Sequence, residues 1–143
     1  MIILDTNILS AVMQETPDPT VVNWLDRQAR ESIWTTAITV FEIRLGLSIL
    51  EKGKRREKLE LAFTLALQEV LEGRVLPFDE PAALAAGEIA AKRRRQGITV
   101  DMRDTQIAGI AMARRSTLAT RHTKDFAALT VRVINPWKER KEE

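Results

Sequence analysis

The segment Ile2-Ile3-Leu4-Asp5-Thr6-Asn7 decides how the rest of the sequence is interpreted. Its three apolar residues, of which Ile2 and Ile3 are β-branched, predict a short buried strand that ends at Asp5. A short helix is expected next, over residues 8–13. A carboxylate at the end of a buried strand loses much of its hydration, so Asp5 needs hydrogen-bonding or charged partners.

The alternation of strand and helix continues along the chain. Apolar segments predict further strands at 33–35, 75–78, 118–120 and 131–134. Helical spacing predicts helices over 19–30, 37–51, 57–71, 79–96 and 101–115. Pro77 cannot donate a backbone hydrogen bond, which places its strand at a sheet edge or the proline at a strand end. The expected fold class is therefore α/β, with a short, mainly parallel five-stranded sheet flanked by helices.

The composition fits one globular domain. Of the 143 residues, 45% are hydrophobic and 29% are charged, and this length is typical of a single domain. There is no cysteine, and His122 is the single histidine, which excludes disulfides, thiolate metal sites and a three-histidine zinc site. We assign residues 1–137 to the domain and expect the charged residues 138–143 to be frayed.

The sequence contains no membrane or secretion signal. No apolar run approaches the roughly 18 residues that a membrane span requires. The residues before Asp5 also lack the basic start of a secretory signal. We therefore expect a cytoplasmic protein without a membrane partner.

Ligands of parallel α/β sheets bind beyond the carboxyl ends of the strands, and this rule singles out four acidic residues. Asp5 follows the first predicted strand, and Asp125 follows the fourth. Glu42 lies within a predicted helix, and Asp104 lies in the first turn of another. Taken one by one, the aspartates are also typical helix caps, and Glu42 is also typical of a solvated helix face.

As a set, the four acids are more informative. They come from four elements of one small domain, and if they converge, their mutual repulsion requires a cation. Oxygen ligands without cysteine or a histidine cluster favour Mg²⁺ or Mn²⁺. Such a site polarises a phosphoryl oxygen and activates a bound water molecule, which predicts phosphodiester hydrolysis.

Clusters of basic residues are candidates for binding a polyanion. One cluster comprises Lys52, Lys54, Arg55, Arg56 and Lys58, and another comprises Lys92, Arg93, Arg94 and Arg95. The alternative is that these residues form a solvated helix end and a solvated loop. The net charge of +2 does not decide between the two interpretations.

Ordered motifs cover nearly the whole chain. They are ILDTN at 3–7, TAITVFEIRLG at 36–46, VLPFD at 75–79, DTQIAGIA at 104–111, ATRHTKDF at 119–126 and VINPW at 133–137. Together they resemble the PIN-domain ribonuclease toxins of bacterial toxin–antitoxin operons, the VapC-like group. The resemblance is greatest to the FitB-like or plasmid-stability branch of that group.

This resemblance implies a PIN-like fold and an endoribonuclease that depends on Mg²⁺ or Mn²⁺. The three essential acids of the family fall on Asp5, Glu42 and Asp104. Asp125 matches an acid found in many relatives and is a further candidate metal ligand. The function implied is that of the toxin of a type II toxin–antitoxin system, in which metal-activated water hydrolyses RNA.

Supporting residues also follow from the resemblance. Thr6 matches a hydroxyl that supports the first acid or bound water, and Asn7 lies beside it. The fourth polar position of the family, often Asp or Asn, falls on His122, which is a departure from the pattern. We expect His122 to contact substrate phosphate or outer-shell water.

The resemblance implies three partners: an RNA substrate, a small antitoxin that occludes the active site and often binds operator DNA, and a second copy of the chain in a homodimer. The candidate RNA-binding residues are Lys52, Lys54, Arg55, Arg56, Arg93, Arg94 and Arg121.

Two alternatives stay open. A haloacid-dehalogenase-like phosphatase also begins with a strand that ends in Asp, but it needs a second Asp two residues later, where this chain has Asn7. A degenerate PIN domain would bind its antitoxin or RNA without cleavage, and His122 at the fourth polar position favours that interpretation. Other enzyme motifs, such as Gly-x-Ser-x-Gly and the Walker phosphate loop, are absent from the sequence.

Overall fold

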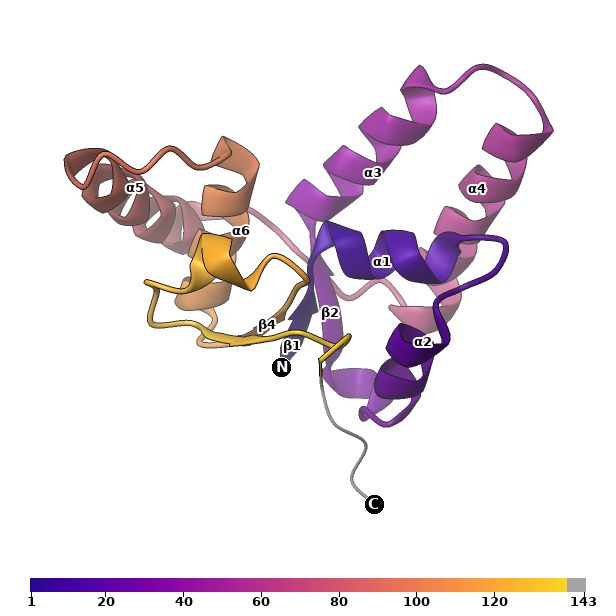
Figure 1. Ribbon diagram of the computed structural model, residues 1–143, viewed down its shortest axis with the longest axis horizontal. Helices are drawn as coiled ribbons and strands as arrows, with labels where there is room; N and C mark the ends of the chain where they lie inside the picture. Colours follow the sequence, from indigo (N-terminus) through magenta and orange to yellow (C-terminus); the bar gives the residue numbers. More distant parts are fainter. Residues whose placement is uncertain (139–143) are drawn as a thin grey trace.

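A five-stranded parallel sheet forms the centre of the molecule, as the computed structural model of residues 1–138 shows (Figure 1). The strands lie in the order β3-β2-β1-β4-β5, and every neighbouring pair is parallel. The strands are β1 (Ile2–Leu4), β2 (Ile33–Thr36), β3 (Val75–Leu76), β4 (Thr117–Ala119) and β5 (Arg132–Ile134). The predicted α/β class and five-stranded sheet are confirmed.

Helices cover both faces of this sheet. Within the described residues these are α1 (Thr6–Met13), α2 (Pro19–Asp26), α3 (Ala37–Ile49), α4 (Lys54–Leu65), α5 (Glu80–Arg95) and α6 (Met102–Ala113). Helices α5 and α6 lie together on one side of the sheet, and α1 to α4 lie on the other (Figure 1). None of the helices in residues 1–138 is long and apolar enough to cross a membrane.

The alternation of side chains along β1 gives each face its own core. Ile3 packs in a cluster with residues of α5 and α6. Leu4 packs in a second cluster with residues of α1 to α4. Both side chains are fully buried, as expected for the central strand of a sheet covered on both faces.

Polar residues at the ends of strands start the helices that follow. Asp5 accepts the backbone N–H of Thr6 at 2.8 Å and so caps α1. Thr36 accepts the N–H of Thr39 at 3.1 Å and caps α3. Such a cap contributes about 1 kcal/mol to helix stability. The capping interpretation of Asp5 is therefore correct, but it accounts for only part of what this carboxylate contacts.

Some predicted bounds differ from those observed. The helix predicted over 19–30 ends at Asp26, because the chain forms a short turn, η1 (Arg30–Ser32), before β2. The helix predicted over 57–71 begins at Lys54 and continues from α4 into a π-helical turn, η2 (Ala66–Val70). The first basic cluster therefore lies mostly on a helix. Residues 139–143 of the tail predicted to be frayed are outside the described residues.

Close packing of α5 against α6 fixes one wall of the site. Gly109 of α6 faces α5 so closely that an added Cβ would lie 2.6 Å from the Ala82 carbonyl oxygen and 2.6 Å from the Ala86 Cβ. Only a residue without a side chain fits there without displacing α5. This contact holds α6, and with it Asp104 in its first turn, against the rest of the domain.

Candidate active site

A cleft of about 560 Å³ opens beyond the carboxyl ends of β1 and β4. The four acids predicted from the sequence, Asp5, Glu42, Asp104 and Asp125, all line it. The predicted supporting residues Thr6, Asn7 and His122 and the candidate RNA contact Arg121 line the same cleft. The fold thus brings residues from both ends of the chain to one surface.

Asp5 forms the floor of this cleft. Its side chain is 3% exposed, and its two oxygens accept hydrogen bonds from the Thr6 backbone at 2.8 Å, the Thr120 hydroxyl at 2.7 Å and the Asn7 amide at 3.1 Å. Burial raises the pKa of Asp5, and these hydrogen bonds act in the opposite direction. Among residues 1–138, no lysine or arginine forms an ion pair with it. Its buried carboxylate therefore has hydrogen-bond donors but no lysine or arginine partner in the described part of the chain.

Thr120 is a site residue that the sequence analysis missed. It is fully buried and donates to Asp5 while accepting the backbone N–H of His122 at 3.1 Å. Asn7 adds a second link, because its amide oxygen accepts the N–H of Arg121 at 3.0 Å. These bonds join the end of β1 to the loop after β4. A hydroxyl directly after a buried strand was the available signal.

Glu42 reaches the cleft from α3. Its Oε1 accepts a hydrogen bond from the Thr6 hydroxyl at 3.1 Å, and Thr39 lies beside this contact, with its hydroxyl oxygen 3.2 Å from that of Thr6. Partial burial raises the pKa of Glu42, and the neighbouring charge of Asp5 contributes in the same direction. Glu42 is thus held toward Asp5 through the Thr6 side chain.

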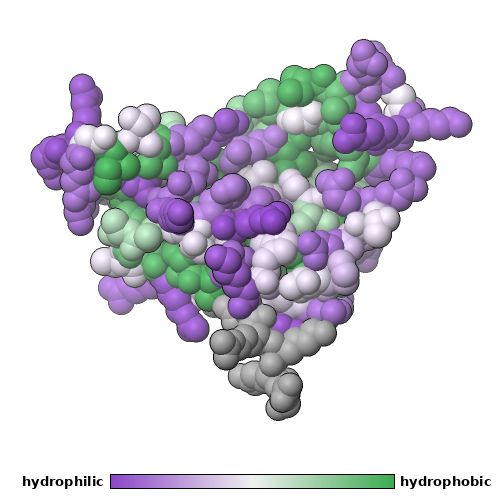
Figure 2. All heavy atoms as spheres, in the orientation of Figure 1, coloured by the Kyte–Doolittle hydropathy of each residue, from purple (hydrophilic) through white to green (hydrophobic). Residues whose placement is uncertain are grey.

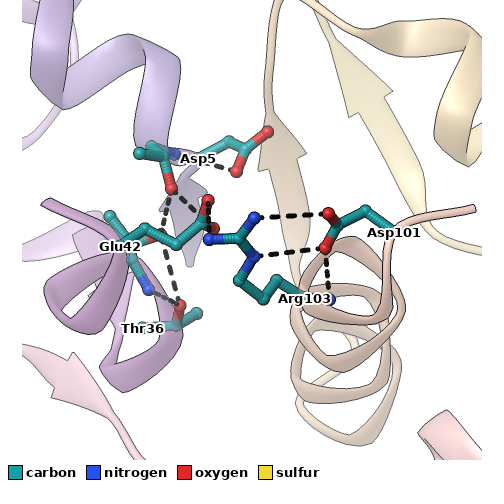
Figure 3. A network of polar contacts seen from close by, with 7 residues as sticks. Asp5, Thr36, Glu42, Asp101 and Arg103 are labelled. Atoms are coloured by element: carbon teal, nitrogen blue, oxygen red, sulfur yellow. Dashed lines mark hydrogen bonds and ion pairs between the residues drawn. The ribbon is translucent and has the colours of Figure 1, made fainter. Parts of the chain in front are cut away.

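Arg103 was also missed by the sequence analysis. Its guanidinium lies between two acids, as Figure 3 shows, with Nε 3.2 Å from Asp101 Oδ1 and Nη1 3.9 Å from Glu42 Oε2. The pair with Glu42 is long and partly exposed, so it contributes little stability. Arg103 nevertheless gives Glu42 the countercharge that Asp5 lacks. The signal was an arginine between two acids at the start of a predicted helix.

The pKa of Asp104 is raised well above that of an ordinary aspartate. Burial, together with the charges of Asp5, Asp101, Asp125 and Glu42, raises its pKa to about 6. These contributions show that the acids lie close enough for their charges to interact. A cation bound among them would relieve this repulsion.

The donor set of the cleft fits a hard divalent cation. Carboxylate, hydroxyl and amide oxygens surround the space, and these are the ligands that Mg²⁺ and Mn²⁺ favour. Within the described part of the chain, no three acidic or histidine side chains already stand close enough to enclose an ion. The partly exposed side chains of Glu42 and Asp104 would therefore have to shift for the acids to share one ion.

The basic residues predicted to bind RNA are distributed over three places. Lys52, Lys54, Arg55 and Arg56 lie at the corner where α3 meets α4, outside the residues that line the cleft. In that corner, which we call the basic corner, Arg56 pairs with Glu60 at 2.9 Å and donates to the Leu50 carbonyl oxygen at 3.3 Å. Arg94 is exposed near the end of α5. Only Arg121 of these candidates lines the cleft.

Arg93 requires a correction. It is 8% exposed, and it donates to the Thr105 hydroxyl at 3.3 Å and to the backbone carbonyl oxygen of Asp125. These bonds join α5 to α6 and to the turn η3 (Thr123–Phe126). They give Arg93 a structural role in place of the predicted contact with RNA.

Comparisons with known proteins agree with this geometry. The PIN domain family matches residues 2–130. Toxin FitB of Neisseria gonorrhoeae is 39% identical over 96% of this chain and 99% of its own length. VapC ribonuclease Y4jK of Sinorhizobium fredii is 38% identical over 96% of this chain and 98% of its own length. The structure of FitAB bound to an IR36 DNA fragment has a TM-score of 0.87 at 37% identity and covers 100% of both chains.

The likeness to the FitAB structure extends over the whole α/β sheet. The comparisons confirm the resemblance that the sequence motifs carry, and they exclude the phosphatase alternative. This chain belongs to the PIN-domain family.

Proposed function

We propose that this chain is a metal-dependent endoribonuclease and the toxin of a type II toxin–antitoxin system. The observation that carries the proposal is that Asp5, Glu42, Asp104 and Asp125 line one cleft although they come from separate elements. Relatives named as a toxin and as a ribonuclease support the same function.

Asp5, Glu42 and Asp104 would hold a Mg²⁺ or Mn²⁺ ion, with Asp125 as a further ligand. When bound, such an ion polarises a phosphoryl oxygen and lowers the pKa of a water molecule that attacks the phosphodiester. The protein itself would contribute by positioning the carboxylates. Thr6 donates to Glu42, and Asn7 donates to Asp5, so these two carboxylates are restrained in the cleft.

The polar residues that follow β4 in the cleft would bind the RNA backbone. Arg121 and His122 follow β4 and face the same space as the acids. A cationic guanidinium there offsets the charge of a phosphate that approaches an acidic site. We assign His122 to the substrate phosphate or to outer-shell water, since its backbone, fixed by Thr120, places it at the cleft.

We further propose that a small antitoxin covers this cleft and that the chain forms a homodimer. A FitAB assembly on DNA among the solved relatives supports a partner protein that binds operator DNA. The proposed RNA substrate and antitoxin support a cytoplasmic location.

The test is cleavage of a mixed set of end-labelled RNAs by the chain purified free of antitoxin. Reactions contain Mg²⁺, Mn²⁺ or EDTA, beside the double variant Asp5→Asn/Asp104→Asn. We expect cutting in either metal and none in EDTA or with the variant. Folded wild-type protein that binds RNA but cuts with neither metal would support the degenerate module instead, an alternative that the pairing of Arg103 with Glu42 favours.

A further inference from the structure

The rim of the cleft carries an aromatic side chain that hydrolysis does not use. Trp137 lines the same cleft as Asp5 and Asp104. The guanidinium of Arg121 lies over its ring, 4.8 Å from the ring centroid. A cation over an indole at this distance is a favourable pair, and this one stands beside an acidic site.

Trp137 is held in a fixed orientation. Its ring N–H donates to Asp18 Oδ2 at 2.8 Å, and its backbone N–H donates to Asn135 Oδ1 at 3.0 Å. The bond from Trp137 and the nearby charge of Arg121 both lower the pKa of Asp18, so the acceptor stays ionised. The ring is therefore ordered in the free protein, and a ligand that uses it does not have to order it.

The guanidinium of Arg121 is available to a ligand. The backbone N–H of this residue is fixed by Asn7 at 3.0 Å, but its side chain is exposed. Within the described residues its guanidinium forms no ion pair with a carboxylate. The guanidinium lies over the Trp137 ring, and the rest of its exposed surface is available to a ligand in the cleft.

We propose that Arg121 and Trp137 form a nucleobase-binding subsite, in which an unpaired base of single-stranded RNA stacks on the guanidinium that Trp137 supports. This inference rests on the proposed function, because the acids in the same cleft would hold the neighbouring scissile phosphate. Unpaired bases stack on arginine planes and on aromatic rings whatever their sequence. The subsite therefore gives preference for unpaired RNA.

Two simpler roles compete with this one. Arg121 could contact only phosphate, in which case its charge matters and its flat shape does not. Trp137 could serve only to tie the segment after β5 to Asp18, in which case its loss lowers stability and leaves RNA recognition unchanged. The experiment must separate the base contact from both.

The probe is a short single-stranded oligoribonucleotide with a fluorescent label, together with versions in which one base at a time is removed and the backbone is kept. Binding is measured with the full chain carrying Asp104→Asn, so that the RNA stays intact. We expect removal of one particular base to weaken binding about 5- to 150-fold, the effect of one stacked base. Trp137→Ala and Arg121→Ala should weaken binding of the intact RNA similarly and should be insensitive to that base.

Four variants complete the design. Trp137→Phe keeps a ring without the bond to Asp18 and should retain sensitivity to the base, while Trp137→Leu should lose it. Arg121→Lys should keep the salt dependence of binding but lose sensitivity to the base. Arg27→Ala, at an exposed arginine outside the cleft, should leave that sensitivity unchanged.

The proposal is overturned if no single base matters to the parent, or if the same base matters equally to Trp137→Ala and Arg121→Ala. It is also overturned if Arg121→Lys behaves as the parent does. Cleavage by the wild-type chain is measured in parallel. Cleavage without base dependence refutes the subsite alone, and base-dependent binding without cleavage refutes the nuclease alone.

Discussion

The acidic cleft and the basic corner both stand out in the sequence by their charge, but they reach their positions in different ways. The acids of the cleft come from separate elements and are brought together by the sheet. The residues of the basic corner are neighbours in the sequence and mostly exposed. In Figure 2, hydrophilic side chains lie across the middle of the face and at its two outer ends, where α5 ends and where α3 meets α4.

This difference separates a site from a charged surface. Charges that the fold gathers against their own repulsion need a partner from outside, and the raised pKa of Asp104 reflects that need. The charges of the basic corner are solvated or paired locally, as Arg56 is with Glu60. We therefore expect changes in the cleft to alter function and changes at the corner to alter it little.

The largest effect is expected from Asp5→Asn. The amide keeps the size of the side chain but removes a charge that would hold the metal, so RNA cleavage should fall by about a thousandfold or more. Asp101→Asn is the matched control, since Asp101 is exposed near the same acids. It should retain most of the activity. Equal loss in both variants would contradict the assignment.

The next effect concerns stability and compares two glycines within helices. Gly109→Ala places a methyl group 2.6 Å from backbone and side-chain atoms of α5 and should destabilise the fold by about 1–3 kcal/mol. Gly46→Ala, in α3 before the basic corner, meets nothing within 4 Å and should stabilise by roughly 0.5–1 kcal/mol. Urea unfolding of both variants measures the difference, and the same sign for both would refute the packing argument.

RNA binding should also distinguish the two regions. Arg121→Gln removes a cation from the cleft and should weaken binding about tenfold, as expected for one charge-assisted or stacked contact. The triple variant Lys52→Gln/Lys54→Gln/Arg55→Gln removes more charge but from outside the cleft, and it should have the smaller effect. Filter binding at two salt concentrations compares them. A larger effect at the corner would make it part of the RNA path.

The raised pKa of Asp104 predicts a pH dependence of stability without metal. The folded protein keeps the proton up to about pH 6, whereas the unfolded chain releases it near 3.8. The folded state thus binds more protons in this interval, and stability falls as pH rises through it. The Tm in EDTA should drop between pH 4 and pH 7, and Mg²⁺ should restore it at pH 7 only. Asp104→Asn should flatten the profile.

The smallest effect is expected at Arg103. Its long contact with Glu42 competes with a metal ion for that carboxylate, but an exposed pair of this kind is weak. Arg103→Gln should therefore tighten Mn²⁺ binding only a few-fold in a calorimetric titration. Arg114→Gln, which breaks a pair with Asp79 outside the cleft, should not change it. Weaker binding by Arg103→Gln would show that Arg103 organises the site instead.

Much of the site was predictable because sheet topology is regular. Asp5 follows a short β-branched strand, and parallel strands carry such residues to one edge. The same rule located Arg121 and His122 after β4. The partners of these residues were not predictable, because Thr120, Arg103 and Trp137 become part of the site only through tertiary contacts.

Arg93 shows that the charge of a residue does not always predict its exposure to solvent. In a run of four basic residues it indicates a solvated helix end, yet it is buried. Its position continues the buried stripe of α5, which runs through Ala82, Ala86 and Ile89 at intervals of four and three residues. Helical spacing was therefore the better signal for this residue, and charge was the better signal for exposed Arg94.

The central claim is that the acids gathered in the cleft form a site for a divalent cation. Titration of Mn²⁺ into the metal-free chain, followed by electron paramagnetic resonance of the free ion, tests it directly. We predict saturable binding to the wild type and to Asp101→Asn, and loss of binding in Asp5→Asn/Asp104→Asn of the same fold. Equal binding by the wild type and the double variant would contradict the account.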